Sequence, residues 1–213
     1  MSTARPDPDD LTARARIRDA ALFCFAQHGF SAPLRMIADR AGVSVPLITH
    51  HYGTKDALRQ VCDDWVLERF TQTKLLAIQR PDSVRDTLAD TSQASVLMVY
   101  MLRCFLDATS SALAFFERYK EQLRQIMAKA AEAGLVTTAD DEEERLHQLA
   151  SQSIGSLLVE FVIHPPADPR HFIDQAYTSR AMLTQLNLYT HPVFTPSEAL
   201  QTYIASVRGM RGR

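Results

Sequence analysis

Residues 34–52 place the tightest constraint on the fold of this chain, because they hold two short apolar-faced segments separated by one glycine. Ile37, Val43 and Ile48 have the spacing of side chains that fill the space between crossing helices. Gly42 supplies the left-handed backbone conformation that a tight turn needs and that most residues avoid. The segment therefore predicts two short helices joined by a tight turn, at residues 34–41 and 45–52.

The other segments also predict helices, since none of them shows a sustained period-two alternation of β-branched residues. Helical spacing and turn residues place further helices at residues 11–28, 55–79, 84–109, 111–133, 140–164, 169–189 and 196–208. The polar first half of the segment at 84–109 is alternatively a separate turn. The fold class is therefore all-α, with an N-terminal three-helix helix-turn-helix head and a larger C-terminal helical body.

Cap residues mark several of the expected helix ends. Gly29 is expected to end the first helix in a left-handed cap, and Pro33 to occupy the first turn of the second helix. Ser44, Thr54 and Thr195 are expected to be the N-caps of the helices that follow them.

We expect three parts along the chain. Residues 1–10 carry two Pro and three Asp with almost nothing apolar, which is typical of a flexible tail. The head takes residues 11–60 and the body takes residues 61–213. The head holds seven Arg or Lys and three acids, a net charge of +4, whereas the body carries −4. This asymmetry indicates a basic module that meets phosphate and an acidic body that stays in solvent.

The positions of the cysteines and the hydropathy of the chain indicate the cellular compartment of the protein. Cys24, Cys62 and Cys104 lie far apart, without metal-site or redox spacing, so we expect buried free thiols in a reducing environment. The N-terminus lacks an apolar signal core, and no uncharged run reaches the ~20 residues that a membrane helix needs. We therefore expect a cytoplasmic protein with no membrane partner.

The exposed face of the helix at 45–52 has the dimensions to enter a DNA major groove. Three blocks around it, Phe23–Phe30, Ile37–Ser44 and His50–Leu58, resemble the tetracycline-repressor (TetR) family of bacterial regulators. The resemblance covers about residues 12–62; the rest of the chain is similar only in being helical and of suitable length. It implies a homodimer of DNA-binding heads on helical ligand-binding bodies. Such a protein regulates transcription at double-stranded operator DNA, most simply as a repressor that a small-molecule effector releases.

The resemblance also assigns DNA-binding positions. Arg35 falls where family members can touch a base or a phosphate, and a bidentate contact to guanine would give ~1–3 kcal/mol of discrimination. Lys55 falls at the family's phosphate-contacting lysine, where a helix N-terminus adds backbone N–H groups and a positive dipole end. The predicted set is Arg35, Ser44, Val45, Pro46, Leu47, Thr49, His50 and Lys55.

Some positions depart from the family pattern. Thr49 replaces an aromatic residue that often contacts phosphate, and Leu47 replaces a more usual small polar residue, so the reading face favours thymine methyl groups. The loop at residues 31–33 is one residue shorter than usual and lacks the common Thr cap. His50 and His51 are adjacent, so they point in different directions on a helix, and without a third ligand we expect no metal.

Two apolar segments of the body, Ala94–Leu106 and Ile154–Ile163, are interrupted by Arg103 and Glu160. Because a lone buried ion is costly, these two either pair with each other or with surface partners, or one of them anchors a ligand. An arginine anchor would favour a carboxylate or phosphate ligand, and a glutamate anchor would favour a cation. The other predicted ligand-binding residues, which are alternatively plain core, are Trp65, Met98, Met101, Phe105, Phe116, Tyr119 and Phe161. These apolar walls suit a greasy or aromatic effector.

The last two predicted helices offer a self-complementary apolar face. Its members are Phe172, Ala176, Met182, Leu183, Leu186, Leu188, Leu200, Tyr203, Ile204 and Val207. We predict a two-fold homodimer through this face, because one head reads only a half-site. The alternative is packing against the body of the same chain.

Enzymatic function is not expected, and neither is a cofactor. The His residues of the body are scattered, and the sequence holds no Glu-x-x-His, no Gly-x-Ser-x-Gly and no phosphate-binding glycine loop. The alternative function is a regulator-like helical protein that acts through protein contacts without specific DNA binding, which Leu47 and Thr49 keep open. Replacing Lys55 by Glu distinguishes the two functions. Repression should vanish if the protein acts by binding DNA, and it should persist if the protein acts through protein contacts.

Overall fold

The computed structural model describes residues 8–83, 91–107, 110–176, 179–191 and 193–210. Every regular element within these ranges is a helix, as the all-α fold class requires. Contacts divide the chain into two compact units, residues 1–176 and 177–213, which we describe separately. No helix in the described ranges is both long enough and apolar enough to span a membrane.

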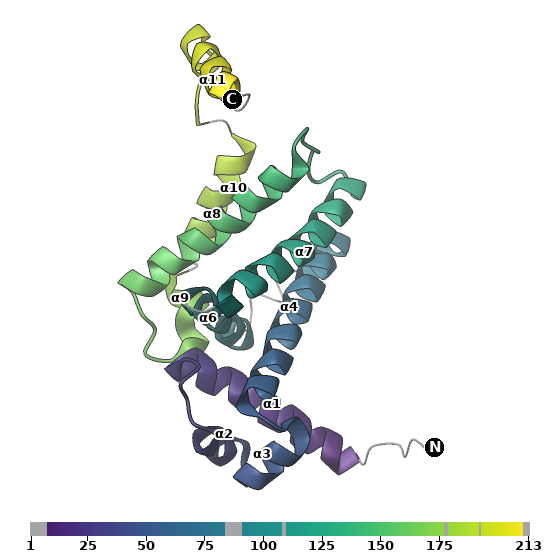
Figure 1. Ribbon diagram of the computed structural model, residues 1–213. Helices are drawn as coiled ribbons and strands as arrows, with labels where there is room; N and C mark the ends of the chain where they lie inside the picture. Colours follow the sequence, from purple (N-terminus) through teal and green to yellow (C-terminus); the bar gives the residue numbers. More distant parts are fainter. Residues whose placement is uncertain (1–7, 84–90, 108–109, 177–178, 192, 211–213) are drawn as a thin grey trace. The chain divides into compact units, whose positions relative to one another are not determined.

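Unit 1 begins with the predicted head. Its helices are α1 (Pro8–His28), α2 (Leu34–Ala41) and α3 (Val45–Tyr52), and the predicted bounds of α2 and α3 are confirmed. α1 begins at Pro8, three residues before the helix predicted at 11–28; residues 1–7 lie outside the described ranges. In Figure 1, α2 and α3 lie together at one end of the unit, next to α1.

Glycines shape the two turns of the head. Gly29 (φ 74°) follows α1 and Gly42 (φ 65°) follows α2, both in the left-handed region, which confirms the two predicted turns. The expectation for Pro33 is wrong, because Pro33 is the N-cap of α2 and lies outside its first turn. Ser44 is at the N-cap position of α3, but its side chain makes no capping hydrogen bond.

α4 (Lys55–Gln79) is a single helix that continues from the head into the body. The Thr54 hydroxyl accepts a 3.1 Å hydrogen bond from the N–H of Ala57, which confirms the predicted N-cap. α4 passes through residues 60–61 without a break, so one helix belongs to both predicted parts. The functional division at this point remains a prediction. A short 3₁₀ turn, η1 (Pro81–Ser83), follows α4.

After η1, the part of unit 1 that the structure describes continues with three long helices and two short elements. They are α6 (Ser92–Leu106), α7 (Ser110–Glu132), α8 (Glu142–Ile163), η2 (Pro169–His171) and α9 (Phe172–Ala176). Within the described ranges, the helix predicted at 84–109 is present only as α6; residues 84–90 and 108–109 lie outside them.

The described part of the helix predicted at 169–189 begins as a 3₁₀ turn and not as an α-helix, and residues 177–178 lie outside the described ranges. Asp168 precedes η2, and its carboxylate accepts a 2.9 Å hydrogen bond from the N–H of Arg170, which favours a tight 3₁₀ turn. α9 then ends at Ala176, and α10 begins at Ser179 in unit 2.

A continuous core joins head and body within unit 1. Phe25 of α1, Ile37 of α2 and Ile48 of α3 belong to the same buried cluster as Tyr100 of α6 and Phe172 of α9. Burying side chains of this size stabilises a fold by about 1.5–3 kcal/mol each. The three cysteines are free and buried, as expected, and burial raises the pKa of the Cys62 thiol.

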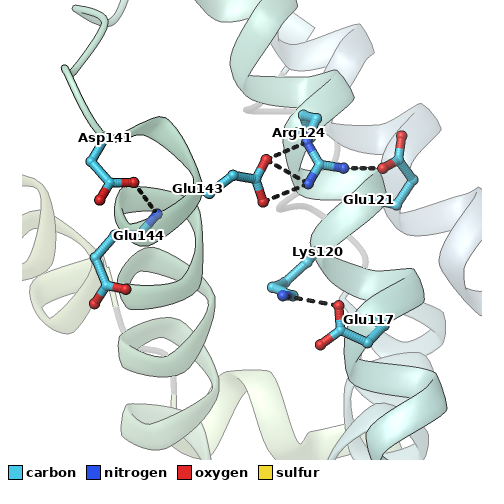
Figure 2. Close-up of polar contacts among 7 residues, drawn as sticks. All are labelled: Glu117, Lys120, Glu121, Arg124, Asp141, Glu143 and Glu144. Carbon is cyan, nitrogen blue, oxygen red and sulfur yellow. Dashed lines mark hydrogen bonds and ion pairs between the residues drawn. The ribbon is translucent and has the colours of Figure 1, made fainter.

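Figure 2 shows how α7 and α8 are connected near the turn between them. The Arg124 guanidinium of α7 donates to both carboxylate oxygens of Glu143 on α8, at 2.7 and 2.8 Å. The carboxylate of Asp141 caps α8 by accepting a 3.1 Å hydrogen bond from the N–H of Glu144. These exposed pairs contribute at most about 1 kcal/mol each, so they fix the register of the two helices more than they stabilise the fold.

Unit 2 consists of α10 (Ser179–Thr190) and α11 (Glu198–Met210). Thr195 is not the N-cap of the last helix, because α11 starts later and the Ser197 hydroxyl accepts a 3.2 Å hydrogen bond from the N–H of Leu200. Large apolar side chains on both helices are exposed, among them Leu183 at 62% and Tyr203 at 68%. Unit 2 therefore has more apolar surface than its own packing covers.

Candidate DNA-binding interface

α3 is held against the head by one side. Ile48 is 1% exposed, and the Tyr52 hydroxyl donates a 2.7 Å hydrogen bond to the backbone carbonyl of Arg14 on α1. Burial raises the pKa of Tyr52, so this hydroxyl keeps its proton and remains a donor. The buried side of α3 thus fixes which side faces away from the head.

The predicted reading residues lie on or beside that outward side. Ser44, Pro46, Thr49 and His50 are exposed, while Val45 and Leu47 are partly buried. Val45 also packs against the core cluster, so it has a structural contact besides any contact with DNA.

The Thr49 side chain is exposed, but its hydroxyl forms a hydrogen bond within α3. It donates a 3.3 Å hydrogen bond to the backbone carbonyl of Val45. A Thr hydroxyl bonded in this way offers its methyl group and its lone pairs to a groove. The reading face of α3 is therefore mainly apolar, with His50 as its polar side chain.

Two basic residues flank α3. Arg35 is exposed on the first turn of α2, and Lys55 is partly buried at the first position of α4. The first N–H groups of α4 and the Lys55 ammonium share one helix end, which suits an anionic phosphate. Asp56 shares this first turn, and its charge opposes part of that attraction.

His50 and His51 lie next to each other, with ring centroids 5.4 Å apart. Over the described ranges, no group of three or more His, Cys, Asp or Glu side chains is arranged to hold a metal ion. His50 is exposed and His51 is partly buried, so the two adjacent side chains lie in different surroundings.

The predicted effector residues do not gather at one place. Trp65 lies at the α1–α4 contact, where the guanidinium of Arg18 lies 4.4 Å from its ring centroid. Phe105 lies 6.3 Å from Phe116 and 5.9 Å from Tyr119, between ring centroids. Met98 and Met101 of α6 pack against the core cluster. The aromatic trio thus forms one compact group, and Arg103 lies beside Phe161 at another place.

Of the alternatives left open for Arg103 and Glu160, a mutual ion pair is not formed. The Nε of Arg103 donates a 3.3 Å hydrogen bond to the carbonyl of Ala26 at the end of α1, and its guanidinium lies 5.1 Å from the Phe161 ring centroid. Glu160 instead lies 3.3 Å from the Nδ1 of His164. Arg103 therefore acts as a C-cap that joins α6 to α1.

A groove of about 440 Å³ lies between α4 and α7 and was not expected. Its polar lining comes from Asp64, Glu68, Thr71, Gln72, Arg118, Glu121, Gln122 and Gln125, with Leu67 as the apolar member. None of the predicted effector residues lines this groove. Its residues come from segments about 50 positions apart, so no local spacing in the sequence could have revealed it.

The helix-turn-helix geometry agrees with comparisons to known proteins. Residues 17–62 match the family model for bacterial regulatory proteins of the tetR family, and residues 92–195 match the model for a tetracyclin repressor-like C-terminal domain. The HTH-type transcriptional regulatory protein RaaS of Mycobacterium tuberculosis is 31% identical over 202 residues, which cover 93% of this chain and 95% of RaaS. The chain belongs to the TetR family, and it is a DNA-binding transcriptional regulator.

Two further comparisons cover the head and the fold. The HTH-type transcriptional dual regulator CecR of Shigella flexneri is 34% identical over 56 residues, which are 26% of this chain and 25% of CecR. The solved structure of SmeT, the repressor of the Stenotrophomonas maltophilia multidrug efflux pump SmeDEF, superposes with a TM-score of 0.52 at 20% identity. It covers 86% of this chain and 94% of SmeT, and it shows that the two share a fold.

Proposed function

We propose that the protein is a repressor that binds operator DNA through α3 and releases it when a small molecule binds the body. Residues 11–60 act as the DNA-binding head and residues 61–213 as the ligand-binding and dimerisation body. The outward side of α3, with Arg35 on one flank and Lys55 on the other, is the observation that carries this proposal. A protein bound there would exclude other proteins from the same DNA, which is the simplest route to repression.

The DNA contacts divide into two kinds. Lys55 and the α4 N-terminus contact a phosphate and set the register of the head, while Arg35, Pro46, Leu47, Thr49 and His50 face the bases. Ser44 and Val45 shape the start of α3. The apolar side chains on this face favour thymine methyl groups over polar base edges.

The protein binds its operator as a homodimer. The exposed apolar side chains of α10 and α11 give a self-complementary face, and two heads at fixed spacing reach two successive half-sites. Because its target is DNA, we place the protein in the cytoplasm. It acts there by binding, without catalysis or a cofactor.

The effector is an apolar or aromatic molecule. Phe105, Phe116 and Tyr119 form a compact aromatic group between α6 and α7, and Phe105 and Phe116 are only partly buried. A planar ligand that stacks there would press on α6, which contacts α1 through Arg103. Its binding would thus change the position of the head.

The direct test is selection of duplexes from a random DNA pool, followed by titration of the selected duplex at several salt concentrations. Wild-type protein should enrich a palindromic sequence. Lys55→Glu should weaken binding to that duplex at least tenfold, because it turns a phosphate contact into a repulsion. Lys129→Glu changes the same charge on the exposed face of α7 and serves as the control.

Two outcomes would contradict the proposal. One is failure of the wild-type protein to enrich any sequence at moderate salt. The other is repression in cells that persists in the Lys55→Glu variant, which would favour action through protein contacts.

A further inference from the structure

The Phe23 ring on α1 contacts both α2 of the head and the 3₁₀ turn η2 of the body. The guanidinium carbon of Arg40, on α2, lies 3.3 Å from the ring centroid. The guanidinium carbon of Arg170, on η2, lies 5.7 Å from the same centroid. A DNA-binding helix and the turn after α8 thus meet at one aromatic side chain.

Arg170 is held in place by its own turn. Both carboxylate oxygens of Asp168 accept hydrogen bonds from the Arg170 Nε, each at 3.0 Å. These bonds lower the pKa of Asp168 to about 2, so the carboxylate is ionised at neutral pH. The negative charge offsets the repulsion between Arg170 and Arg40 at the shared ring.

The turn is also fixed to α1 and α6. The Gln27 Nε2 on α1 donates a 2.8 Å hydrogen bond to the carbonyl of Ala167. Just after the turn, the N–H of Ile173 donates a 3.1 Å hydrogen bond to the Ser95 hydroxyl of α6, and Phe172 is fully buried. The segment 167–171 therefore has little freedom of its own.

We propose that segment 167–171 connects α2 of the head to the body, in addition to the attachments through α4 and through the α1–α6 contact, and that Arg170 is a positioning residue for α2. It acts through Phe23 and Arg40, and it touches no base or phosphate. The other two attachments hold α1 and α4, whereas the contact at Phe23 reaches Arg40 of α2 itself. The inference rests on the proposed function, in which α2 and α3 bind the operator.

The experiment uses the full-length protein and the duplex selected from the random pool. Arg170→Ala should weaken binding three- to tenfold, while Arg170→Lys, which keeps a cation near the ring, should give an intermediate affinity. Lys129→Ala, the charge-matched control on α7, should bind as the wild type does. The slope of log affinity against log salt should be the same in all four proteins, because no phosphate contact is lost.

Two further variants separate positioning from simple charge. Asp168→Asn keeps the acceptor for the N–H of Arg170 but removes a negative charge, so general electrostatics predicts tighter DNA binding and positioning predicts weaker binding. In a Phe23→Leu background, Arg170→Ala should have no further effect, since residues that act through one contact are not additive.

Hydrogen exchange of the free protein gives a readout that needs no DNA. Amides of residues 34–41 should exchange faster in Arg170→Ala than in the wild type, with the helix at 111–131 unchanged. Unchanged exchange, or unchanged operator affinity, would overturn the inference. So would a salt slope reduced by about 0.9, which marks a lost phosphate contact. If the wild type selects no duplex, the proposed function fails, and the exchange rates still decide whether Arg170 positions α2.

Discussion

The hydroxyl of Tyr100 on α6 donates a 2.6 Å hydrogen bond to the carboxylate of Asp63 on α4. Next to it, the guanidinium of Arg59 pairs with Asp107 at 2.7 Å. Tyr100 is fully buried, so this polar cluster forms part of the core. It joins α4, the helix that leaves the head, to α6 in the centre of the body.

Removal of the Tyr100 hydroxyl should therefore destabilise the fold. In Tyr100→Phe, the carboxylate of Asp63 keeps its burial but loses its shortest hydrogen bond, which should lower the free energy of unfolding by about 1–3 kcal/mol. Urea unfolding followed by circular dichroism measures this change. Ser151→Ala removes a hydroxyl from an exposed position on α8 and should change the free energy of unfolding by less than about 0.5 kcal/mol. Equal curves for the wild type and Tyr100→Phe would show that the hydrogen bond adds no stability.

The same carboxylate should make stability depend on pH. Burial raises the pKa of Asp63, although hydrogen bonds from Tyr100 and the charge of Arg59 act in the opposite direction. The folded protein thus binds this proton more tightly than the unfolded chain does. The associated stability is fully present below the unfolded pKa of about 3.9 and is lost as the pH rises through the folded pKa.

Asp63→Asn removes the titrating carboxyl group, but its amide oxygen can still accept the hydrogen bond from the Tyr100 hydroxyl. Its unfolding free energy relative to the wild type should therefore increase as the pH rises from about 4 to 7. Thermal or urea unfolding of both proteins across this range gives the difference. A difference that is constant with pH, or that favours the wild type more at higher pH, would contradict the raised pKa.

Local sequence patterns predicted the head well because its determinants are local. The bounds of α2 and α3, the turn at Gly42 and the cap at Thr54 each depend on residues within a few positions of one another. The body was harder, since Arg103 contacts the carbonyl of Ala26 far away in the sequence, and spacing alone suggested Glu160 as its partner. The break after α8 was predicted between residues 164 and 169, but the 3₁₀ form of residues 169–171 was not, because it depends on how the carboxylate of Asp168 bonds to the turn.

The predicted effector residues show the same limit. Trp65, Phe105 and Phe161 each have the composition and helical spacing of pocket residues, but those properties are shared by plain core residues. The tertiary packing is needed to distinguish the aromatic group around Phe105 from Trp65. The guanidinium of Arg18 lies over the Trp65 ring. No spacing rule distinguishes a half-buried aromatic side chain from a fully buried one.

The turn between α2 and α3 should not tolerate a side chain. A Cβ on Gly42 would meet nothing within 4 Å, yet its φ of +65° is one that L-residues rarely adopt. Gly42→Ala should therefore cost about 1–2 kcal/mol from backbone conformation alone. Gly155 also has open space around it but lies within α8, so Gly155→Ala should stabilise by up to about 1 kcal/mol. If both variants shift the unfolding midpoint in the same direction, backbone conformation does not explain the effect at Gly42.

The apolar face of unit 2 should hold the homodimer together. Tyr203 is 68% exposed on α11, and a charge at this position would have to be buried if the face pairs with its copy. Tyr203→Asp should therefore shift the protein from dimer to monomer in analytical ultracentrifugation at micromolar concentration. It should also weaken operator binding, because a single head contacts only one half-site.

Ala205→Asp provides the matched control for this substitution. Ala205 is exposed on the same helix, two positions further on, and so it points roughly 200° away from Tyr203 around the helix axis. The new charge has a comparable effect on the helix itself but stays in solvent, so this variant should remain a dimer. Dissociation by Ala205→Asp alone would place the interface on the opposite side of α11. A dimer that survives both substitutions would show that α11 lies outside the interface altogether.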